Sequence, residues 1–317
     1  MAKKLKSIKE VVASNVKEIA DGITVEKLSS IFFDATKLKA QPDPLYRLDS
    51  SGHRYYYKFD ENEEPIFFTS VTTLIRNTLP TSPHLIQWLV SKQGSGAEEA
   101  EERAHYGTFL HVECAELLIN GTYDLDKLQK KLDAYAEIHK IQVLKGWVDE
   151  LKKDVLAFAQ FIIDRNVKPL AIEICLYHPT DGYAGAIDLV AELDWSKKRI
   201  VGIIDLKSGR KGFYESHEIQ LGAYKDMWEI HFPDVRVDKI FNWSPTAWRK
   251  SPSYKLKDQT DSSNIAKLPN LVANAKIEDA KRDNSVTTVS GKIDLVKGLG
   301  GNIEELTFTE LIKKNKL

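Results

Sequence analysis

Two aspartates and a lysine interrupt apolar runs within residues 185–209, which have the sequence GAIDLVAELDWSKKRIVGIIDLKSG. The apolar runs flank a polar stretch at 194–198, a pattern that predicts an antiparallel hairpin. Asp188 and Asp205 stand where a buried strand normally carries aliphatic side chains, and Lys207 follows Asp205 by two positions. Hard divalent cations such as magnesium prefer clustered carboxylate oxygens. These residue types therefore indicate chemistry that depends on a metal ion.

The register of this hairpin decides whether the charged residues can meet. A turn centred between Ser196 and Lys197 places Asp188 opposite Asp205, with their Cβ atoms about 5 Å apart. Strand alternation puts Lys207 on the same face. Two carboxylates and an ammonium group are costly to bury between apolar strands unless they are paired or bind a cation. The alternative is a surface hairpin in which the same charges form an ordinary ion pair.

Two further positions carry ionisable side chains in apolar surroundings. In YGTFLHVECAELL, a predicted helix, Gly107 and His111 are four residues apart and share one face, so the glycine leaves room beside the imidazole. Glu173 interrupts the apolar strand LAIEICLY. A helical histidine is more often a packing or surface residue, and Glu173 is equally consistent with a charge at a strand edge. Neither position identifies a site by itself.

A third segment, HEIQLGAYKDMW, has helical spacing. His217, Gln220 and Tyr224 are three and four residues apart and share a face that we expect to point toward Lys207. The adjoining apolar stripe is expected to pack on the sheet and consists of Ile219, Ala223 and Met227. Alone, this pattern is that of an ordinary amphipathic helix.

The elements that must position these side chains follow from the periodicity of the apolar residues. Before the hairpin, the sequence predicts two short helices within 5–38, a β-meander over 46–68, a short helix over 69–79 capped by Thr69 or Ser70, and a mostly helical region over 83–165 interrupted at 94–96. The meander contains three consecutive tyrosines at 55–57. Tyrosines can stack on bases, although an aromatic strand more often packs on its own sheet.

From residue 167 onward the pattern changes to strands. A strand over 168–178 precedes the hairpin, and a helix over 214–230 and a last strand over 238–243 follow it. With the preceding helix, the order is αβββαβ, which predicts an α/β fold with a central sheet flanked by helices. Farther on, we expect a helix over 270–283 and then a glycine-containing loop.

These elements suggest a division of the chain into four parts. They are an N-terminal helical segment at 1–40, the meander and short helix at 41–82, the helical region with the α/β core at 83–247, and a C-terminal extension at 248–317.

The composition limits the classes of protein. The 317 residues are 42% hydrophobic, enough for a sizeable core, and the net charge is −1, so any groove for DNA must be a local basic patch. The two cysteines, Cys114 and Cys175, exclude a disulfide framework, a four-cysteine zinc site and a four-cysteine iron–sulfur cluster. The first residues resemble no secretory signal, and no apolar run reaches the roughly 18 residues that span a membrane. We therefore expect a cytoplasmic protein with no membrane partner.

In chain order, the motifs are a helical G-x-x-x-H, a strand glutamate, G-x-x-D, D-x-K and a helical Q-x-x-x-Y. This order resembles the PD-(D/E)XK nuclease superfamily, specifically its RecB-type exonuclease branch, which includes phage recombination nucleases and a mitochondrial single-strand exonuclease. The segments FFTSVTTLI and LIQWL resemble the N-terminal part of that branch, and the resemblance covers about 67–243. The proline of the family name is absent before Asp188, as are the four cysteines that hold an iron–sulfur cluster in some relatives. The implied fold is a restriction-endonuclease-like core with an N-terminal helical elaboration.

The resemblance implies a role for each matching residue. His111, Asp188 and Asp205 would be metal ligands, together with the backbone carbonyl of Leu206. One or two magnesium or manganese ions are the implied cofactor, and the imidazole favours manganese because nitrogen ligands suit later metals than magnesium. Glu173 matches a less uniform position of the catalytic set.

Further residues are implied in catalysis and in DNA contacts. Lys207 would be the catalytic lysine, and Gln220 and Tyr224 would hold it and contact the nucleic-acid backbone. Arg210 and Lys211, in the loop SGRKG after the site, are candidates for phosphate contacts, although a plain turn explains the same sequence. The helical region could form one wall of a passage for a DNA strand, or a solvated surface, with Arg103, Lys130, Lys131, Lys140 and Lys145.

The implied activity is hydrolysis of DNA phosphodiester bonds by a metal-dependent exonuclease that acts on single-stranded DNA or on duplex ends. Recombination, repair or replication in a bacterial or phage-infected cell is the implied setting, with recombination or replication proteins as partners. The alternatives are a structure-specific endonuclease or resolvase, and a non-catalytic DNA-binding protein that keeps the fold. The intact charged set argues against the last, because a binding scaffold needs no catalytic cluster.

Overall fold

The structure is a computed structural model that describes residues 34–50, 53–92, 96–210, 212–282, 287–291 and 303–307. Outside these residues lie positions 5–33 of the segment 5–38 that was predicted to form two helices, positions 94 and 95 of the predicted interruption, Lys211, and most of the predicted loop after 283. None of the helices in the described ranges is long and apolar enough to cross a lipid bilayer.

The predicted meander is present and belongs to the main sheet. A 3₁₀ turn at Ala35–Lys37 precedes three antiparallel strands, β1 (Tyr46–Ser50), β2 (His53–Phe59) and β3 (Pro65–Ser70). At its end, β3 pairs in parallel with the start of β5 (Tyr183–Trp195). The tyrosines at 56 and 57 are buried, as the packing interpretation predicts.

The helices that precede the core begin with α3 (Val71–Thr78), whose N-cap is Ser70: its side chain accepts a hydrogen bond from the Thr73 amide. They continue with α4 (Pro83–Ser91), α5 (Gly96–Asn120), α6 (Leu128–His139), which follows a 3₁₀ turn at Leu125–Lys127, and α7 (Trp147–Asp164). The expectation of a single interruption near 94–96 was wrong. Two more breaks occur: Gly121 and Lys140 have positive φ angles and end α5 and α6, and Gly146, also with a positive φ angle, lies at the start of α7.

The predicted hairpin is confirmed, including its register. It joins β5 to β6 (Lys198–Leu206), and Leu189 pairs with Ile204 while Trp195 pairs with Lys198. The turn residues Ser196 and Lys197 have φ angles of 47° and 64°. Two positive φ angles in a two-residue turn match the right-handed twist of the flanking strands.

The rest of the predicted order αβββαβ is also present. Strand β4 (Lys168–His178) pairs with β5, helix α8 (Glu215–His231) follows β6, and β7 (Lys239–Pro245) pairs in parallel with β6. The expected α/β fold with a mixed sheet is confirmed. The prediction that β7 is the last strand was wrong, because β8 (Tyr254–Asp258) pairs with it on the outside. Alternation of apolar and polar residues, which marks a strand with one buried face, is weak in an exposed edge strand of this kind. The sequence therefore gives little indication of it.

The C-terminal region contributes to the core. A 3₁₀ turn at Ser263–Lys267 leads into α9 (Leu268–Arg282), which begins before the predicted 270 and accommodates Pro269 in its first turn, where no intrahelical N–H bond is lost. Its buried residues Leu268, Leu271 and Val272 pack with α3 and α8. Strands β9 (Thr287–Gly291) and β10 (Ile303–Thr307) form a separate two-stranded sheet.

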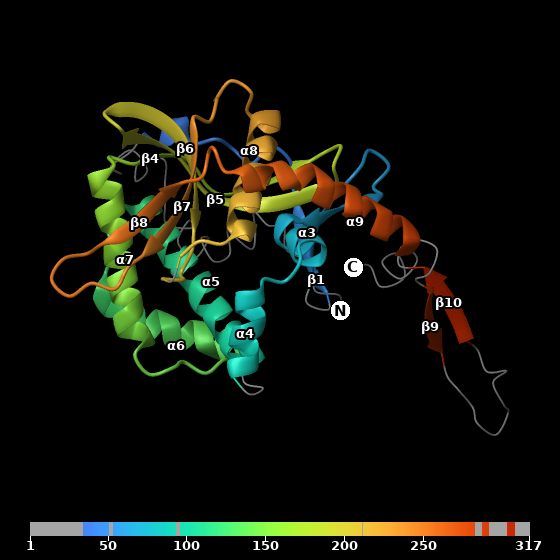
Figure 1. Cartoon of the computed structure of the whole chain (residues 1–317), viewed down its shortest axis with the longest axis horizontal. Helices are drawn as coiled ribbons and strands as arrows, with labels where there is room; N and C mark the ends of the chain where they lie inside the picture. Colours follow the sequence, from blue (N-terminus) through green and yellow to red (C-terminus); the bar gives the residue numbers. More distant parts are fainter. Residues whose placement is uncertain are drawn as a thin grey trace.

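Two helical layers enclose the main sheet (Figure 1). One hydrophobic cluster joins α5, α6 and α7 to one face, and a second joins α3, α8 and α9 to the other. Alternation sorts the strand residues between them: Ile204 and Leu206 of β6 face the first cluster, and Ile203 faces the second. Asp205, next to Ile204, therefore faces the α8 layer.

Candidate functional site

Three carboxylates lie side by side across three strands. The β4–β5 register brings Glu173 opposite Asp188, because Ile172 pairs with Leu189 and Ile174 with Ile187 on either side. The β5–β6 register, continued by one residue, brings Asp188 opposite Asp205. Asp188 and Asp205 are buried, and the Glu173 side chain is 19% exposed. Asp188 is thus the central member of the row.

The site forms where the regular ladder of β5 is interrupted. On one side of β5, β3 pairs at 183–184 and β6 pairs only from residue 189 onward. In the gap, the backbone N–H of Leu206 donates to Asp188 Oδ2 at 2.7 Å. On the other side, Glu173 has a φ of 49°, unusual for a residue other than glycine. The interrupted pairing lets carboxylate side chains, rather than backbone carbonyls, occupy this part of the sheet.

His111 reaches the carboxylates from α5, which belongs to the helical layer on the other side of the sheet from α8. Its Nδ1 lies 3.4 Å from Asp188 Oδ1 and 3.9 Å from Glu173 Oε1, and its Nε2 lies 3.0 Å from the Leu206 carbonyl oxygen. One ligand atom from each of His111, Glu173 and Asp188 lies within 4.8 Å of the others. These groups can hold a metal ion. Three of the expected ligands, namely His111, Asp188 and the Leu206 carbonyl, therefore lie together, and Glu173 lies beside them.

Burial and charge act against each other in this group. Burial lowers the pKa of His111, but the Asp188 and Glu173 carboxylates more than offset this and raise it to about 9. Burial and the negative charge of Asp188 raise the pKa of Glu173 to about 8. Burial also opposes ionisation of Asp188, yet the charge and hydrogen bond of His111 hold its pKa below the usual value. The carboxylates of this group therefore favour a positive charge beside them, which a protonated imidazole or a bound cation can supply.

Asp205 has different partners from the other two carboxylates. Lys207 Nζ lies 2.9 Å from its Oδ1 and 2.8 Å from its Oδ2, and Asn242 Nδ2 donates to Oδ2 at 2.7 Å. Burial raises the pKa of Asp205 to about 6, although Lys207 counteracts this. Among the described residues, Asp205 is not a member of the group of three potential ligands. Its role as a ligand remains a prediction, whereas its predicted proximity to Lys207 is confirmed.

The polar face of α8 points toward Lys207, as its spacing predicts. Lys207 Nζ donates to Gln220 Oε1 at 3.0 Å, and Gln220 Nε2 donates to the Tyr224 hydroxyl at 2.5 Å. Burial and then the charge of Lys207 lower the pKa of His217 to about 3, so this imidazole is neutral at pH 7. The predicted apolar stripe is fully buried against the sheet, with Ile219, Ala223 and Met227.

Two glycines permit close packing at the site. A Cβ atom on Gly185 would lie 2.8 Å from Tyr224 Cε1, so only glycine lets the tyrosine ring approach β5. A Cβ atom on Gly107 would lie 3.1 Å from Ser208 Oγ. Gly107 therefore makes room for the loop after β6 and not, as the spacing suggested, for the imidazole of His111.

Arg210 is held by the helical layer. Its Nη2 lies 2.5 Å from Oδ1 of the fully buried Asp154, and its Nη1 lies 3.4 Å from Glu150 Oε2. Asp154 also accepts a hydrogen bond from the Tyr106 hydroxyl at 2.6 Å. These contacts tie the loop after β6 to α5 and α7, so Arg210 is engaged by protein carboxylates in this structure.

Ion pairs also occupy part of the proposed basic wall. Arg103 pairs with Glu150, and Lys131 pairs with Glu113 and Glu116. For these two residues, the structure agrees better with a helix surface of paired charges than with a row of free cations.

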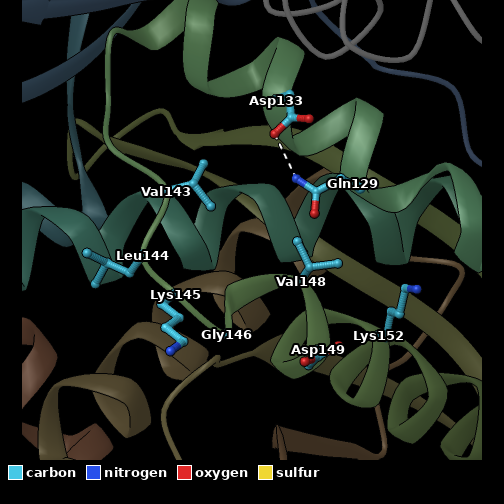
Figure 2. A pocket seen from close by; sticks show the side chains of 9 residues that line it. All are labelled: Gln129, Asp133, Val143, Leu144, Lys145, Gly146, Val148, Asp149 and Lys152. Atoms are coloured by element: carbon cyan, nitrogen blue, oxygen red, sulfur yellow. Dashed lines mark hydrogen bonds between the residues drawn. The ribbon is translucent and has the colours of Figure 1, made fainter.

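A pocket of about 620 Å³ lies away from the carboxylates, between α6 and the start of α7 (Figure 2). Two of its lining residues are joined by a hydrogen bond, in which Gln129 Nε2 donates to Asp133 Oδ1 at 2.8 Å (Figure 2). None of the predicted metal-binding or catalytic residues lines it, although Lys145 was a candidate for the basic wall. The lining residues are Gln129, Asp133, Val143, Leu144, Lys145, Gly146, Val148, Asp149 and Lys152.

The polar residues beside Asp205 in the sheet were missed in the sequence analysis. Asn242 lies in β7 between Phe241 and Trp243 and is fully buried, and Gln259 donates to it from the residue after β8. A polar residue within an apolar strand was the signal that identified Asp188 and Asp205, and the same signal marks Asn242.

Comparisons with known proteins leave the family open. No family model matches the sequence, and no curated protein matches it. The chain has a likeness to a crystal structure from Eubacterium rectale described as a "putative exonuclease", with a TM-score of 0.32 and 13% identity over 57% of this chain and 78% of that chain. A likeness at this level assigns no activity, so the function must be argued from the geometry of the site.

Proposed function

We propose that this chain is a divalent-metal-dependent deoxyribonuclease of the RecB-type branch of the PD-(D/E)XK superfamily. One observation carries the proposal: His111, Glu173 and Asp188 converge beside the Leu206 carbonyl, with the Asp205–Lys207 pair on the neighbouring strand. A structural ion pair needs one carboxylate and one cation. Three carboxylates in one row, two of them buried and the third 19% exposed, carry a desolvation cost that a stable scaffold would avoid.

The donor atoms fit magnesium or manganese. Carboxylate and carbonyl oxygens suit both ions, and the imidazole nitrogen suits manganese better. His111, Asp188, Glu173 and the Leu206 carbonyl would hold the ion, and Asp205 would complete the set from β6. When bound, such an ion would supply an activated water and withdraw charge from the scissile phosphate.

Lys207 would neutralise charge that develops on the phosphate. A lysine ammonium group has three N–H donors, and Lys207 directs two of them to Asp205 and Gln220. Nζ also lies 2.8 Å from the second Asp205 oxygen, so a phosphate oxygen or a water that it binds would replace one of the two Asp205 contacts. Because Gln220 is itself held by Tyr224, the ammonium group is fixed before substrate binds, which favours transition-state stabilisation.

We further propose exonuclease action on single-stranded DNA or on duplex ends, in recombination, repair or replication, because this is the activity of the branch that the motif order resembles. The test is digestion of end-labelled linear and circular DNA, single-stranded and duplex, with magnesium or manganese. Loss of linear DNA with circles left intact is the expected result. Cleaved circles would instead assign an endonuclease, and DNA binding without cleavage under either metal would overturn the nuclease proposal.

The same assay tests the assigned residues. We expect Asp205→Ala and Lys207→Ala to lower the rate at least about a hundredfold. Lys131→Ala is the matched control, because Lys131 is also a half-buried lysine between carboxylates, with 28% of its side chain exposed against 20% for Lys207. It should retain the wild-type rate. Equal loss in Lys131→Ala would show that the effect comes from stability and not from catalysis.

A further inference from the structure

A chain of buried amides leads to the Asp205 carboxylate across the sheet, from β7 and from the residue that follows β8. Asn242 lies opposite Asp205 in the parallel β6–β7 register, and its Nδ2 donates to Asp205 Oδ2 at 2.7 Å. Asn242 is 0% exposed and Asp205 is 1% exposed. A hydrogen bond to a charged group in such surroundings is stronger than one in water, so it has a large influence on how the carboxylate is oriented.

Gln259 sets the direction of this hydrogen bond. Its Nε2 donates to Asn242 Oδ1 at 3.1 Å, and its backbone N–H donates to the Ile240 carbonyl at 2.9 Å. The backbone bond anchors Gln259 directly after β8, and its side chain is also buried. Both amides therefore point the same way, with nitrogen toward Asp205.

The alternative orientation of Asn242 is unfavourable for a specific reason. An asparagine amide has a donor end and an acceptor end that occupy nearly the same volume. If Asn242 turned over, its oxygen would face the Asp205 carboxylate and its NH₂ group would face the Gln259 NH₂ group. Two like contacts would replace two hydrogen bonds, so the Asp205 carboxylate, which can only accept, and the Gln259 amide together favour the orientation that presents a donor to Asp205.

We propose that Asn242 and Gln259 are positioning residues for Asp205, an inference that rests on the proposed function. Asn242 holds Oδ2 while Lys207 contacts both oxygens, so the plane of the carboxylate is defined before metal or substrate binds. Gln259 comes from the segment after 248, for which the sequence suggested only an extension. The C-terminal region thus belongs to the support of the site as well as to the core.

The test uses the full chain with Asn242→Leu and Gln259→Met, which remove the donors at similar volume. We expect a fall of about 10–100-fold in either of two quantities: manganese affinity, measured by calorimetry, or kcat at saturating manganese. KM for DNA should be unchanged. Denaturant unfolding of each metal-free variant shows whether it folds. If Asn242→Leu does not fold, Gln259→Met decides the case, because Gln259 is one hydrogen bond farther from Asp205.

Glu218→Gln is the matched control. Glu218 also joins α8 to the C-terminal region, through Ser262 and Asn264, but within the described part of the chain its hydrogen bonds and ion pair do not involve Asp205. It should lose stability while keeping manganese affinity and kcat. Wild-type manganese affinity and kcat in folded Asn242→Leu and Gln259→Met would overturn the positioning role and leave the nuclease proposal intact. A wild-type protein that cuts no DNA with either metal would instead overturn the nuclease proposal, and with it this inference.

Discussion

The backbone N–H of Leu206 donates to Asp188 Oδ2 at 2.7 Å, so a side-chain carboxylate replaces a strand carbonyl at the point where β6 stops pairing with β5. Asp188 therefore has a structural contact on one oxygen and His111 near the other, at 3.4 Å. The two contacts can be separated by substitution.

Asp188→Asn should keep the fold and lose the metal. The asparagine oxygen can still accept the Leu206 N–H, whereas the charge that binds a cation is gone. Manganese at about 100 times its Kd should raise the free energy of unfolding of the wild type by about 2.7 kcal/mol and leave that of Asp188→Asn unchanged. Urea unfolding with and without manganese measures both. Equal stabilisation of the two proteins would show that the ion binds elsewhere.

Gly185→Ala should destabilise the protein by about 1–3 kcal/mol, because the new Cβ would lie 2.8 Å from the buried Tyr224 ring. Displacement of Tyr224 should also disturb Gln220 and Lys207, so the rate of DNA cleavage should fall. Gly209→Ala is the control, since a Cβ there meets nothing within 4 Å. Urea unfolding and the nuclease assay check both, and an unperturbed Gly185→Ala would contradict the close approach.

The contribution of Glu218 to stability should depend on pH. Burial raises the pKa of Glu218, but hydrogen bonds from Ser262 and Asn264 and the charge of Lys257 outweigh it, so the folded pKa lies below the ordinary 4.5. A carboxylate whose pKa is lower in the folded than in the unfolded protein stabilises the fold at pH values above its unfolded pKa. This stabilisation is lost as the pH falls through its folded pKa.

Glu218→Gln should therefore lower the free energy of unfolding by about 1.5–3 kcal/mol at pH 7, with the difference from wild type shrinking below about pH 4.5. Denaturant titrations between pH 3 and pH 7 measure this. Glu215→Gln, which removes a more exposed ion pair with Lys267, should change stability by less than about 1 kcal/mol. A Glu218→Gln effect that is constant with pH would contradict the argument.

Arg210→Ala should destabilise the protein by about 3 kcal/mol, because it leaves the fully buried Asp154 without its cation. Lys276→Ala, at an exposed pair with Asp181, is the control and should change stability by less than about 1 kcal/mol. Urea unfolding is again the measurement. If Arg210→Ala instead keeps its stability and weakens DNA binding, the original phosphate-contact prediction is the better one.

Local patterns in the sequence were sufficient for much of the fold. Alternation and a polar turn gave the β5–β6 register, and with it the meeting of Asp188 with Asp205 and of Asp205 with Lys207. Spacing on α8 gave the face that carries Gln220 and Tyr224. These features depend on residues near one another in the chain, where backbone geometry allows few arrangements.

Partners distant in sequence were decided only by the tertiary structure. The pairing of β4 with β5 brought Glu173 beside Asp188, and packing of α7 on the loop after β6 gave Arg210 to Asp154. The addition of β8 brought Gln259 to Asn242. The sequence by itself determined which side chains share a face of a strand or helix. The pairing of buried polar groups depends on how the elements assemble. Several donors in the sequence could form a hydrogen bond with the same buried acceptor, and packing selects one of them.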